Sequence, residues 1–226
     1  MYLVTTLGFD EKFQIRSLMR HSGEVEEVII VKPKEADENK DTAKKARAAL
    51  NSFQEILNKL GVKYEVIDIE INNLEAALIK LVQRFKELKG KKVVVNVSGG
   101  MRALILEVIF SFLILGMDVD FEMETEDFSA LLTFSSNDVN FTELDEDEKA
   151  LLIAVNKGVN TVNRLHKNLN IPLSTAWRRV RKLESKGCLK RTATENANSK
   201  LELTLKGRIL AEVLSSGNEK GDFSNQ

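Results

Sequence analysis

The sequence predicts a doubly wound α/β domain followed by a smaller helix-turn-helix domain. Through residues 2–141, short apolar runs alternate with longer amphipathic stretches, which is the pattern of parallel strands joined by crossover helices. After the acidic run at residues 143–148, helical periodicity dominates, and two short strand-like runs follow near the C-terminus. The first part therefore fits the Rossmann-like class, with a mainly parallel sheet, and the second fits a winged helix-turn-helix.

The expected strands of the first domain are apolar runs that end near glycine, proline or polar residues. They cover residues 2–8, 26–33, 62–70, 91–97, 117–125 and 129–135, and the sheet is expected to end near Phe141. Helices are expected after an N-cap at Asp10, over residues 36–60 and 72–88, and within the apolar stretch 98–116. A strand order of 3-2-1-4 would make the first and fourth strands neighbours at the switch point, where ligands bind.

Charge is divided unevenly between the two expected domains. The net charge of -1 combines 18 basic and 24 acidic residues in residues 1–144 with 15 basic and 10 acidic residues in residues 145–226. A basic C-terminal domain on an acidic body favours contact between that domain and a polyanion such as DNA. We therefore expect a ligand-sensing and dimerisation domain at 1–143, a DNA-binding domain at 144–216 and a disordered tail at 217–226.

The compartment is expected to be the cytoplasm. Cys188 is the only cysteine, so an intramolecular disulfide is impossible, and no charged-then-apolar leader is evident. The longest strongly apolar stretch, residues 103–115, contains Glu107 and is shorter than the roughly 20 residues that a membrane span needs. No membrane contact is expected, and the lone His166 and Cys188 do not form a metal-binding pattern.

Two loops that follow strands carry the chemistry of an anion site. Gly99 and Gly100 lie between a buried strand and an apolar helix, where backbone N–H groups and the helix N-terminus attract phosphate and Arg102 could pair with it. A second loop, residues 5–10, leaves the first strand in the same way. The alternative is that the glycines only make a tight turn and that Arg102 forms a surface salt bridge. Neither loop has the G-x-G-x-x-G or G-x-x-x-x-G-K-[ST] fingerprint, which argues against ordinary dinucleotide or NTPase chemistry.

With TTLGFDEK after the first strand and NVSGGMRAL after the fourth, the sequence resembles the CRISPR-associated Rossmann-fold (CARF) domain. Together with the C-terminal winged helix, the chain resembles archaeal CRISPR-associated transcriptional regulators of the Csa group. The resemblance covers residues 1 to about 215. It implies a homodimer whose two equivalent loops bind a cyclic oligoadenylate, with cyclic tetra-adenylate as the expected ring, at one pocket on the two-fold axis.

The resemblance also implies which residues bind this ligand, carried over by position. Those of the fourth-strand loop are Ser98, Gly99, Gly100, Met101 and Arg102, and those of the opposing loop are Thr6, Leu7, Gly8 and Phe9. Some CARF proteins cleave their ligand, so a ring nuclease that uses the winged helix for docking is an alternative. No catalytic residue or cofactor is expected, because cleavage requires a donor or base near the ribose 2′-hydroxyl and the scissile phosphate. None is evident, and His21 lies well past the first loop.

The second domain begins with an expected helix at residues 146–157 that ends at Gly158. A short helix opens at Thr161, and a third helix over residues 173–187 is expected to be capped by Ser174 and closed by Gly187. The runs CLKRTA and KLELTL, joined by residues 194–199, predict a wing before a last helix at residues 206–214.

The third helix is the expected recognition helix. Apolar residues at helical spacing, Leu173, Ala176, Val180 and Leu183, are expected to face the core. The residues expected to contact DNA are Ser174, Thr175, Arg178, Arg179 and Lys182 on this helix and Lys190, Arg191 and Lys200 on the wing. Trp177 is expected to pack in the core rather than on the DNA backbone. The alternatives are a solvated basic face, a protein-docking module, or an architectural DNA-binding protein that responds to no ligand.

Overall fold

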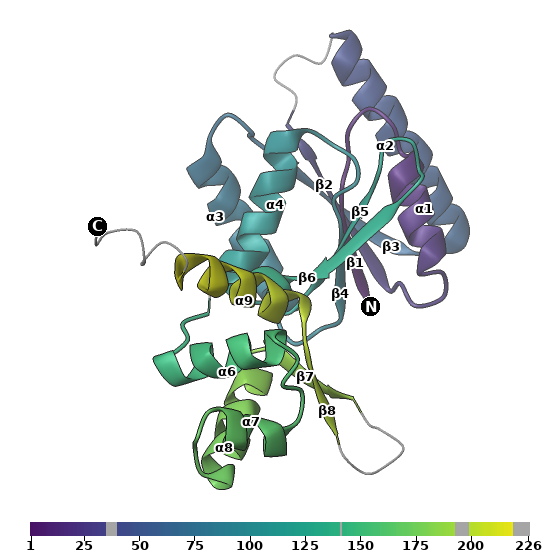
Figure 1. Cartoon of the computed structure of the whole chain (residues 1–226). Helices are drawn as coiled ribbons and strands as arrows, with labels where there is room; N and C mark the ends of the chain where they lie inside the picture. The colour runs from purple at the N-terminus through teal and green to yellow at the C-terminus, as the bar shows by residue number, and fades with distance from the viewer. Residues whose placement is uncertain (35–39, 141, 193–198, 219–226) are drawn as a thin grey trace. The chain divides into compact units, whose positions relative to one another are not determined.

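The structure is a computed structural model that describes residues 1–34, 40–140, 142–192 and 199–218 (Figure 1). It comprises two compact units, Met1–Ser136 and Asn137–Gln226. The division lies upstream of the boundary expected after residue 143. The last strand of the first unit ends at Ser135, so the chain leaves that unit before it reaches the acidic run at residues 143–148.

The first unit contains a six-stranded sheet with the order β3-β2-β1-β4-β5-β6, which confirms the expected doubly wound class and contains the order 3-2-1-4 under which the two loops would meet. Strands β1 to β5 pair in parallel, and β6 runs antiparallel to β5. The strands are β1 Tyr2–Thr6, β2 Glu27–Pro33, β3 Lys63–Ile69, β4 Val93–Asn96, β5 Asp120–Glu124 and β6 Leu131–Ser135. The sheet ends at Ser135 rather than near Phe141, because the short helix α5 (Ser136–Val139) follows at once.

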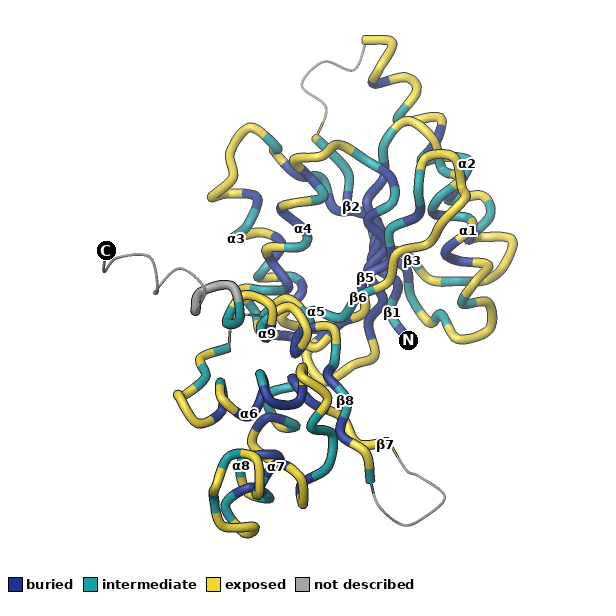
Figure 2. The backbone as a smooth tube through the Cα atoms, in the orientation of Figure 1, coloured by how far each residue is buried: buried dark blue, intermediate teal, exposed yellow. Residues whose placement is uncertain are grey.

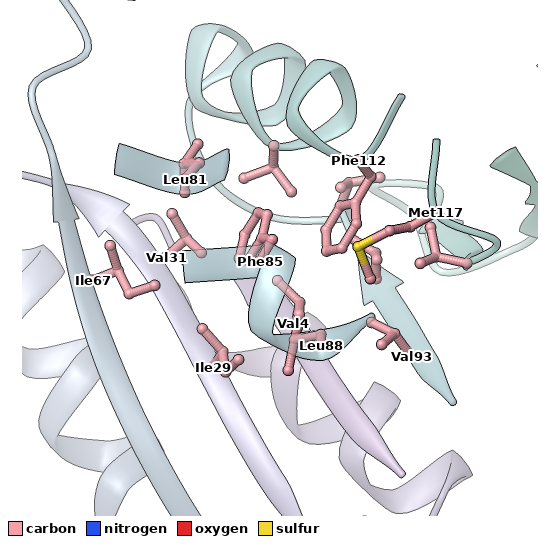
Figure 3. Close-up of a cluster of buried hydrophobic side chains, with 14 of the residues drawn as sticks. Val4, Ile29, Val31, Ile67, Leu81, Phe85, Leu88, Val93, Phe112 and Met117 are labelled. Atoms are coloured by element: carbon pink, nitrogen blue, oxygen red, sulfur yellow. The ribbon is translucent and has the colours of Figure 1, made fainter. Parts of the chain in front are cut away.

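Helices cover both faces of this sheet (Figure 1). Helices α1 (Lys12–Arg20) and α2 (Asp41–Leu60) lie on one face, and α3 (Leu74–Phe85) and α4 (Arg102–Leu115) lie on the other. A short 3-10 turn, η1 (Lys86–Leu88), continues α3. The core between the sheet and α3 and α4 includes Phe85 and Phe112, whose rings stack with centroids 4.4 Å apart (Figure 3). Strand residues facing these helices are almost entirely buried (Figure 2).

The ends of the first two helices differ from the sequence predictions. Asp10 is not the N-cap of α1: Glu11 occupies that position, and the Asp10 carboxylate accepts a hydrogen bond from the Lys12 amide at 2.9 Å. The helix expected at 36–60 begins at Asp41, and residues 35–39 lie outside the described part of the chain. Its predicted end at Gly61 is confirmed, because this glycine adopts the left-handed conformation with φ 68°.

The second unit contains a three-helix core and a two-stranded wing, as predicted. Its elements are α6 Glu146–Asn156, α7 Val162–Asn168, α8 Leu173–Ser185, β7 Leu189–Thr192, β8 Lys200–Leu203 and α9 Leu205–Asn218. Residues 193–198 of the wing and 219–226 of the expected tail lie outside the described residues, and residues 217 and 218 belong to α9. Among the described residues, none of the helices has both the length and the apolar character that a membrane span requires.

Helix α8 begins differently from its prediction. Pro172 occupies the N-cap position, and Ser174 lies exposed in the first turn without a capping role. Leu173, expected in the core, is 41% exposed, whereas Ala176, Val180 and Leu183 are fully buried as predicted. Leu173 is the first helical residue, and the contacts of α8 with the core begin one turn later, at Ala176.

Candidate ligand cavity and nucleic-acid surface

The loops after β1 and β4 meet at the carboxyl edge of the sheet. The strands pair in parallel, with Thr5 opposite Asn96, so both loops leave from the same edge. They approach so closely that a Cβ at Gly8 would lie 3.0 Å from the Cα of Gly100. Gly100 also has a φ of +106°, which L side chains rarely adopt. Glycine at both positions is therefore a steric requirement of this loop contact.

Buried hydrogen bonds join the two loops before any ligand binds. The hydroxyl of Thr6 donates to the carbonyl of Gly99, and the side-chain amide of Gln14 donates to the carbonyl of Thr6. Both side chains are fully buried, and Thr6 does not line the cavity described below. Thr6, expected to contact ligand, therefore holds the loops together instead.

Ser98 also has an internal role. Its hydroxyl donates to Asn96 Oδ1 at 2.6 Å and accepts from the Glu124 amide at 2.8 Å, which ties the loop to β5. The Asn96 side chain in turn donates to the Phe13 carbonyl at 3.0 Å. Ser98 lines the cavity, but its hydroxyl already has two partners.

The amino end of α4 lies directly after the loop that follows β4. Met101 occupies its N-cap position, and no side chain caps the helix, so the first backbone N–H groups remain available as donors. Arg102 is the first helical residue, is exposed, and has no ion-pair partner in the described part of the chain. The sequence alternative in which Arg102 forms a surface salt bridge is therefore wrong for the described residues. Phe9, from the opposing loop, is 56% exposed.

A cavity of about 920 Å³ lies at these loops. Eight residues expected to bind ligand line it: Leu7, Gly8, Phe9, Ser98, Gly99, Gly100, Met101 and Arg102. Sequence reasoning missed its third wall, which consists of the carboxyl end of β2 and the start of α2. The cationic residues of this wall are Lys32, Lys34 and Lys40. The run Lys32-Pro33-Lys34 was visible at a strand end, and the rule that drew attention to the other two loops applies to it equally.

Cations outnumber carboxylates around the cavity. Lys32 pairs with Asp68 at 2.6 Å and Lys34 with Glu70 at 2.8 Å, whereas Lys40 joins Arg102 in having no described partner. The carboxylates in the lining are Asp10 and Glu126, and Asp10 is already paired with Lys12 at 2.9 Å. An excess of cations beside open N–H groups suits an anionic ligand, and the apolar side chains of the walls suit flat or apolar groups.

His21 lies away from the cavity, as the sequence suggested. Its Nε2 is 2.7 Å from Glu122 Oε1, and Arg20 is 3.2 Å from the other oxygen of the same carboxylate. Arg16 pairs with Glu124 at 2.5 Å and lowers the pKa of that carboxyl. These pairs attach α1 to β5. Among the described residues, no group of three or more histidine, cysteine or acidic side chains is arranged to hold a metal ion.

The second candidate site is the surface of α8. Of the expected DNA-contacting residues, Ser174 and Arg178 are exposed and Thr175 is half-buried. Arg179 and Lys182 do not point away from the domain as expected. They form ion pairs with acidic residues at the start of α6, Arg179 with Asp147 and Lys182 with Asp145 at 2.9 Å. Sequence reasoning missed Arg181, which is exposed on the side of the helix opposite Val180 and its buried neighbours.

The cationic residues of the wing also differ in how strongly acidic neighbours bind them. Arg191 pairs with Glu184 at 2.7 Å, and its guanidinium carbon lies 4.8 Å from the ring centroid of Trp177. Trp177 packs against the core of the unit, as predicted. Lys190 and Lys200 are 62% and 48% exposed and lie 3.8 and 3.9 Å from Glu202. These long, exposed pairs hold the two lysines only weakly.

The first unit is thus a Rossmann-like domain with a cationic cavity at its switch point, and the second unit has the elements of a winged helix. The model of the Csa3 CRISPR-associated Rossmann-like domain matches residues 1–135. The chain belongs to this CRISPR-associated family, and the resemblance seen in its two loops is confirmed at that level. No curated protein sequence matches the chain.

Several solved structures are similar to about a third of this chain, and the chain spans less than two thirds of the length of each. A zinc-responsive MarR family member, ZitR from Lactococcus lactis, is 20% identical with a TM-score of 0.34, over 36% of this chain and 58% of that chain. FabT from Streptococcus pneumoniae, solved in complex with DNA, is 23% identical with a TM-score of 0.33, over 34% and 57%. Wild-type MarR from E. coli is 21% identical with a TM-score of 0.31, over 33% and 57%.

Proposed function

We propose that the chain is a CRISPR-associated transcriptional regulator of the archaeal Csa group that senses a cyclic oligoadenylate and binds double-stranded DNA. The sensor is the Rossmann-like unit, and cyclic tetra-adenylate is the expected ring. The DNA-binding part is the winged helix. The proposal assigns no catalytic step to the chain and places it in the cytoplasm.

One observation carries the ligand half of the proposal. The uncapped amino end of α4, the glycine loops and the unpaired Arg102 all border one cavity of about 920 Å³ in which cations outnumber carboxylates. Backbone N–H groups at a helix start and a free guanidinium bind phosphate oxygens. The apolar side chains of the same cavity, including Phe9 and Phe13, suit the faces of nucleobases.

The unusual apolar character of α4 supports a homodimer. Leu104, Val108 and Phe112 face the core, yet Leu106 and Phe110 on the other side are 51% and 42% exposed. A helix that is apolar all round is normally buried on all sides, and a second copy of this chain would cover the exposed one. Because α4 starts at Arg102, a two-fold contact along α4 would also bring two equivalent cavities towards one axis, where a symmetric ring of nucleotides can bind both.

The excess of basic residues in the second unit and its exposed recognition helix support the DNA half. Ligand binding would then alter the spacing of two winged helices relative to DNA half-sites. Such an effect requires that the ligand bind one arrangement more tightly than another.

The first experiment is calorimetric titration of the full chain with cyclic tetra-adenylate, for wild type and Arg102→Ala in parallel. We expect one ring per dimer and at least a tenfold weaker affinity in the variant, because a charge-assisted hydrogen bond to phosphate is lost. Lys89→Ala, far from the cavity at the opposite edge of the sheet, serves as the charge-matched control. Absence of binding heat and of any thermal shift at saturating ring contradicts the ligand half, and linear products would make the chain a ring nuclease.

A further inference from the structure

The recognition helix α8 presents four sides with different chemistry. At 100° per residue, Ala176, Val180 and Leu183 form the buried side, and Ser174, Arg178 and Arg181 lie opposite them. The remaining residues form two flanks, one facing α6 and the other facing the wing. The charged groups on each flank decide which cations are free to meet another molecule.

On the flank facing α6, every cation is bound by an acidic group. Arg179 pairs with Asp147, and its side chain is only 18% exposed. Lys182 lies 2.9 Å from Asp145 and 3.0 Å from Glu148, a carboxylate that is 1% exposed. Lys186 pairs with the other oxygen of Glu148 at 2.7 Å and donates to the Glu143 carbonyl at 2.7 Å. Burial raises the pKa of Glu148, but hydrogen bonds from Lys186, the Asp145 amide and Lys182 outweigh it and keep this carboxyl ionised.

The flank facing the wing is also occupied. Arg191 of β7 makes two contacts of 2.7 Å with the Glu184 carboxylate, through Nε and Nη2, which is the bidentate geometry of a strong pair. The same guanidinium lies over the Trp177 ring. The wing is therefore attached to α8 through this arginine, which has little capacity left for a phosphate.

Arg178 and Arg181 differ from these cations. Both are exposed, and neither has an ion pair or hydrogen bond within the described residues. Together with Ser174 they form a stripe about 10 Å long, since a helix rises about 1.5 Å per residue, which matches about three base pairs. A cation already neutralised by a carboxylate releases few counterions from DNA, whereas an unpaired one releases its full share.

We propose that Arg178 and Arg181, with Ser174, are the residues of α8 that contact DNA, and that Arg179, Lys182, Lys186 and Arg191 are positioning residues. The positioning residues hold the recognition helix between the acidic start of α6 and the wing. This inference rests on the proposed DNA-binding function and divides the cations of α8 into two roles that their sequence positions do not separate.

The dependence of DNA affinity on salt distinguishes the two roles. The probe is a fluorescein-labelled duplex that the full-length wild-type protein selects from a random-sequence pool, titrated at several KCl concentrations. Arg178→Ala and Arg181→Ala should each lower the slope of log K against log salt by about 1, because each removes one phosphate contact. Arg179→Ala and Lys182→Ala should weaken binding while leaving that slope unchanged.

A charge exchange tests the positioning role without relying on loss of function. The single change Arg179→Asp should weaken DNA binding, since it places two acids against each other. Adding Asp147→Arg restores the pair with its charges reversed and should recover most of the affinity, because residue 179 is not required to be a cation for DNA.

The outcomes separate the inference from the function on which it rests. If Arg179→Ala or Lys182→Ala lowers the salt slope while Arg178→Ala and Arg181→Ala leave it unchanged, the assignment is overturned. A charge-exchanged protein that binds no better than Arg179→Asp alone, with an unchanged thermal midpoint, overturns the positioning role of Arg179. If the wild type selects no duplex and binds none at low salt, the proposed DNA-binding function itself fails.

Discussion

Single residues in this chain carry constraints that their neighbours do not share. Glu107 lies in the apolar helix α4, is 2% exposed, and has a carboxylate oxygen, Oε2, without a hydrogen-bond partner in the described structure. Gly207 lies in the first turn of α9, where a Cβ would overlap the carbonyl oxygen of Cys188. Burial of the Glu107 carboxylate lowers stability through desolvation. Gly207, in contrast, allows α9 to approach the backbone at Cys188.

We predict that Glu107→Gln stabilises the protein at neutral pH. Burial raises the pKa of Glu107 above its ordinary value of 4.5, so the folded state binds a proton more tightly than the unfolded state. The free energy of unfolding therefore falls as the pH rises from 4.5 through the folded-state pKa. Glutamine has no charge to desolvate, so it removes this loss.

Thermal unfolding at pH 7.5 and pH 4.5 checks this prediction. The variant should have the higher midpoint at pH 7.5, and the difference should shrink at the acidic pH. Glu55→Gln, an exposed residue in the middle of helix α2, is the control and should change neither midpoint. An equal shift at both pH values would show that ionisation of Glu107 is not the cause.

Gly207→Ala should destabilise the second unit by about 1–3 kcal/mol, the usual range when a tightly packed site receives an extra carbon. The clash involves backbone, so no side-chain rotation relieves it. Denaturant titration compares this variant with Gly23→Ala, where the added methyl meets no atom within 4 Å and only the positive φ of +85° is strained. A loss at Gly207 no larger than that at Gly23 would contradict the steric explanation.

At the scale of elements, α4 contributes both to the ligand cavity and to the exposed apolar face. Its amino end lies at the cavity, while its solvent side continues through Leu106, Phe110 and Ile114, which is 62% exposed. Leu131 and Leu132 on the edge strand β6 are also exposed. An unpaired edge strand and an apolar helix face are both costly in water, which is why a second copy is the expected partner.

Leu106→Asp should shift the protein from dimer to monomer. A carboxylate buried without a partner at an interface costs several kcal/mol, so the dimer dissociation constant should rise at least tenfold. Sedimentation velocity measures this shift. Leu60→Asp, on α2 at the opposite face of the sheet and 53% exposed, is the matched control and should remain dimeric. Dissociation by the control but not by Leu106→Asp would place the interface elsewhere.

At the scale of the whole molecule, the proposed regulation is a thermodynamic coupling between two units. If ring binding changes DNA affinity by some factor, DNA must change ring affinity by the same factor. We expect a factor within the usual range of about 5 to 150. Two experiments measure this coupling factor independently. In one, DNA is titrated with and without saturating ring; in the other, the ring is titrated with and without saturating DNA.

Arg102→Ala should abolish the coupling while leaving DNA affinity without ring unchanged, because the residue lies in the sensor unit. Equal DNA affinity with and without ring in the wild type would show that the units act independently. Unequal factors in the two directions would indicate that a further equilibrium, such as dimer dissociation, takes part.

The sequence by itself determined the class of each unit and the two loops that leave parallel strands at one edge of the sheet. These features follow from local patterns: the alternation of strands and helices implies parallel pairing, and parallel strands deliver their loops to one edge. It also determined the buried side of α8, because hydrophobic spacing records which side of a helix faces the core.

Only the tertiary structure decided how the remaining polar groups are used. Hydrophobic spacing separates buried from unburied residues, but it does not show which other element lies beside an unburied flank. The sequence therefore gave no sign that Arg179 and Lys182 form ion pairs with acidic residues of α6 and its N-cap. It also gave no sign that Arg181 lies on the exposed side of α8. Thr6 and Lys40 show the same dependence on packing. Thr6 is buried behind the loops, whereas the fold of the chain brings Lys40 into the cavity wall. Contacts between distant segments depend on how the elements pack, and local patterns do not record that packing.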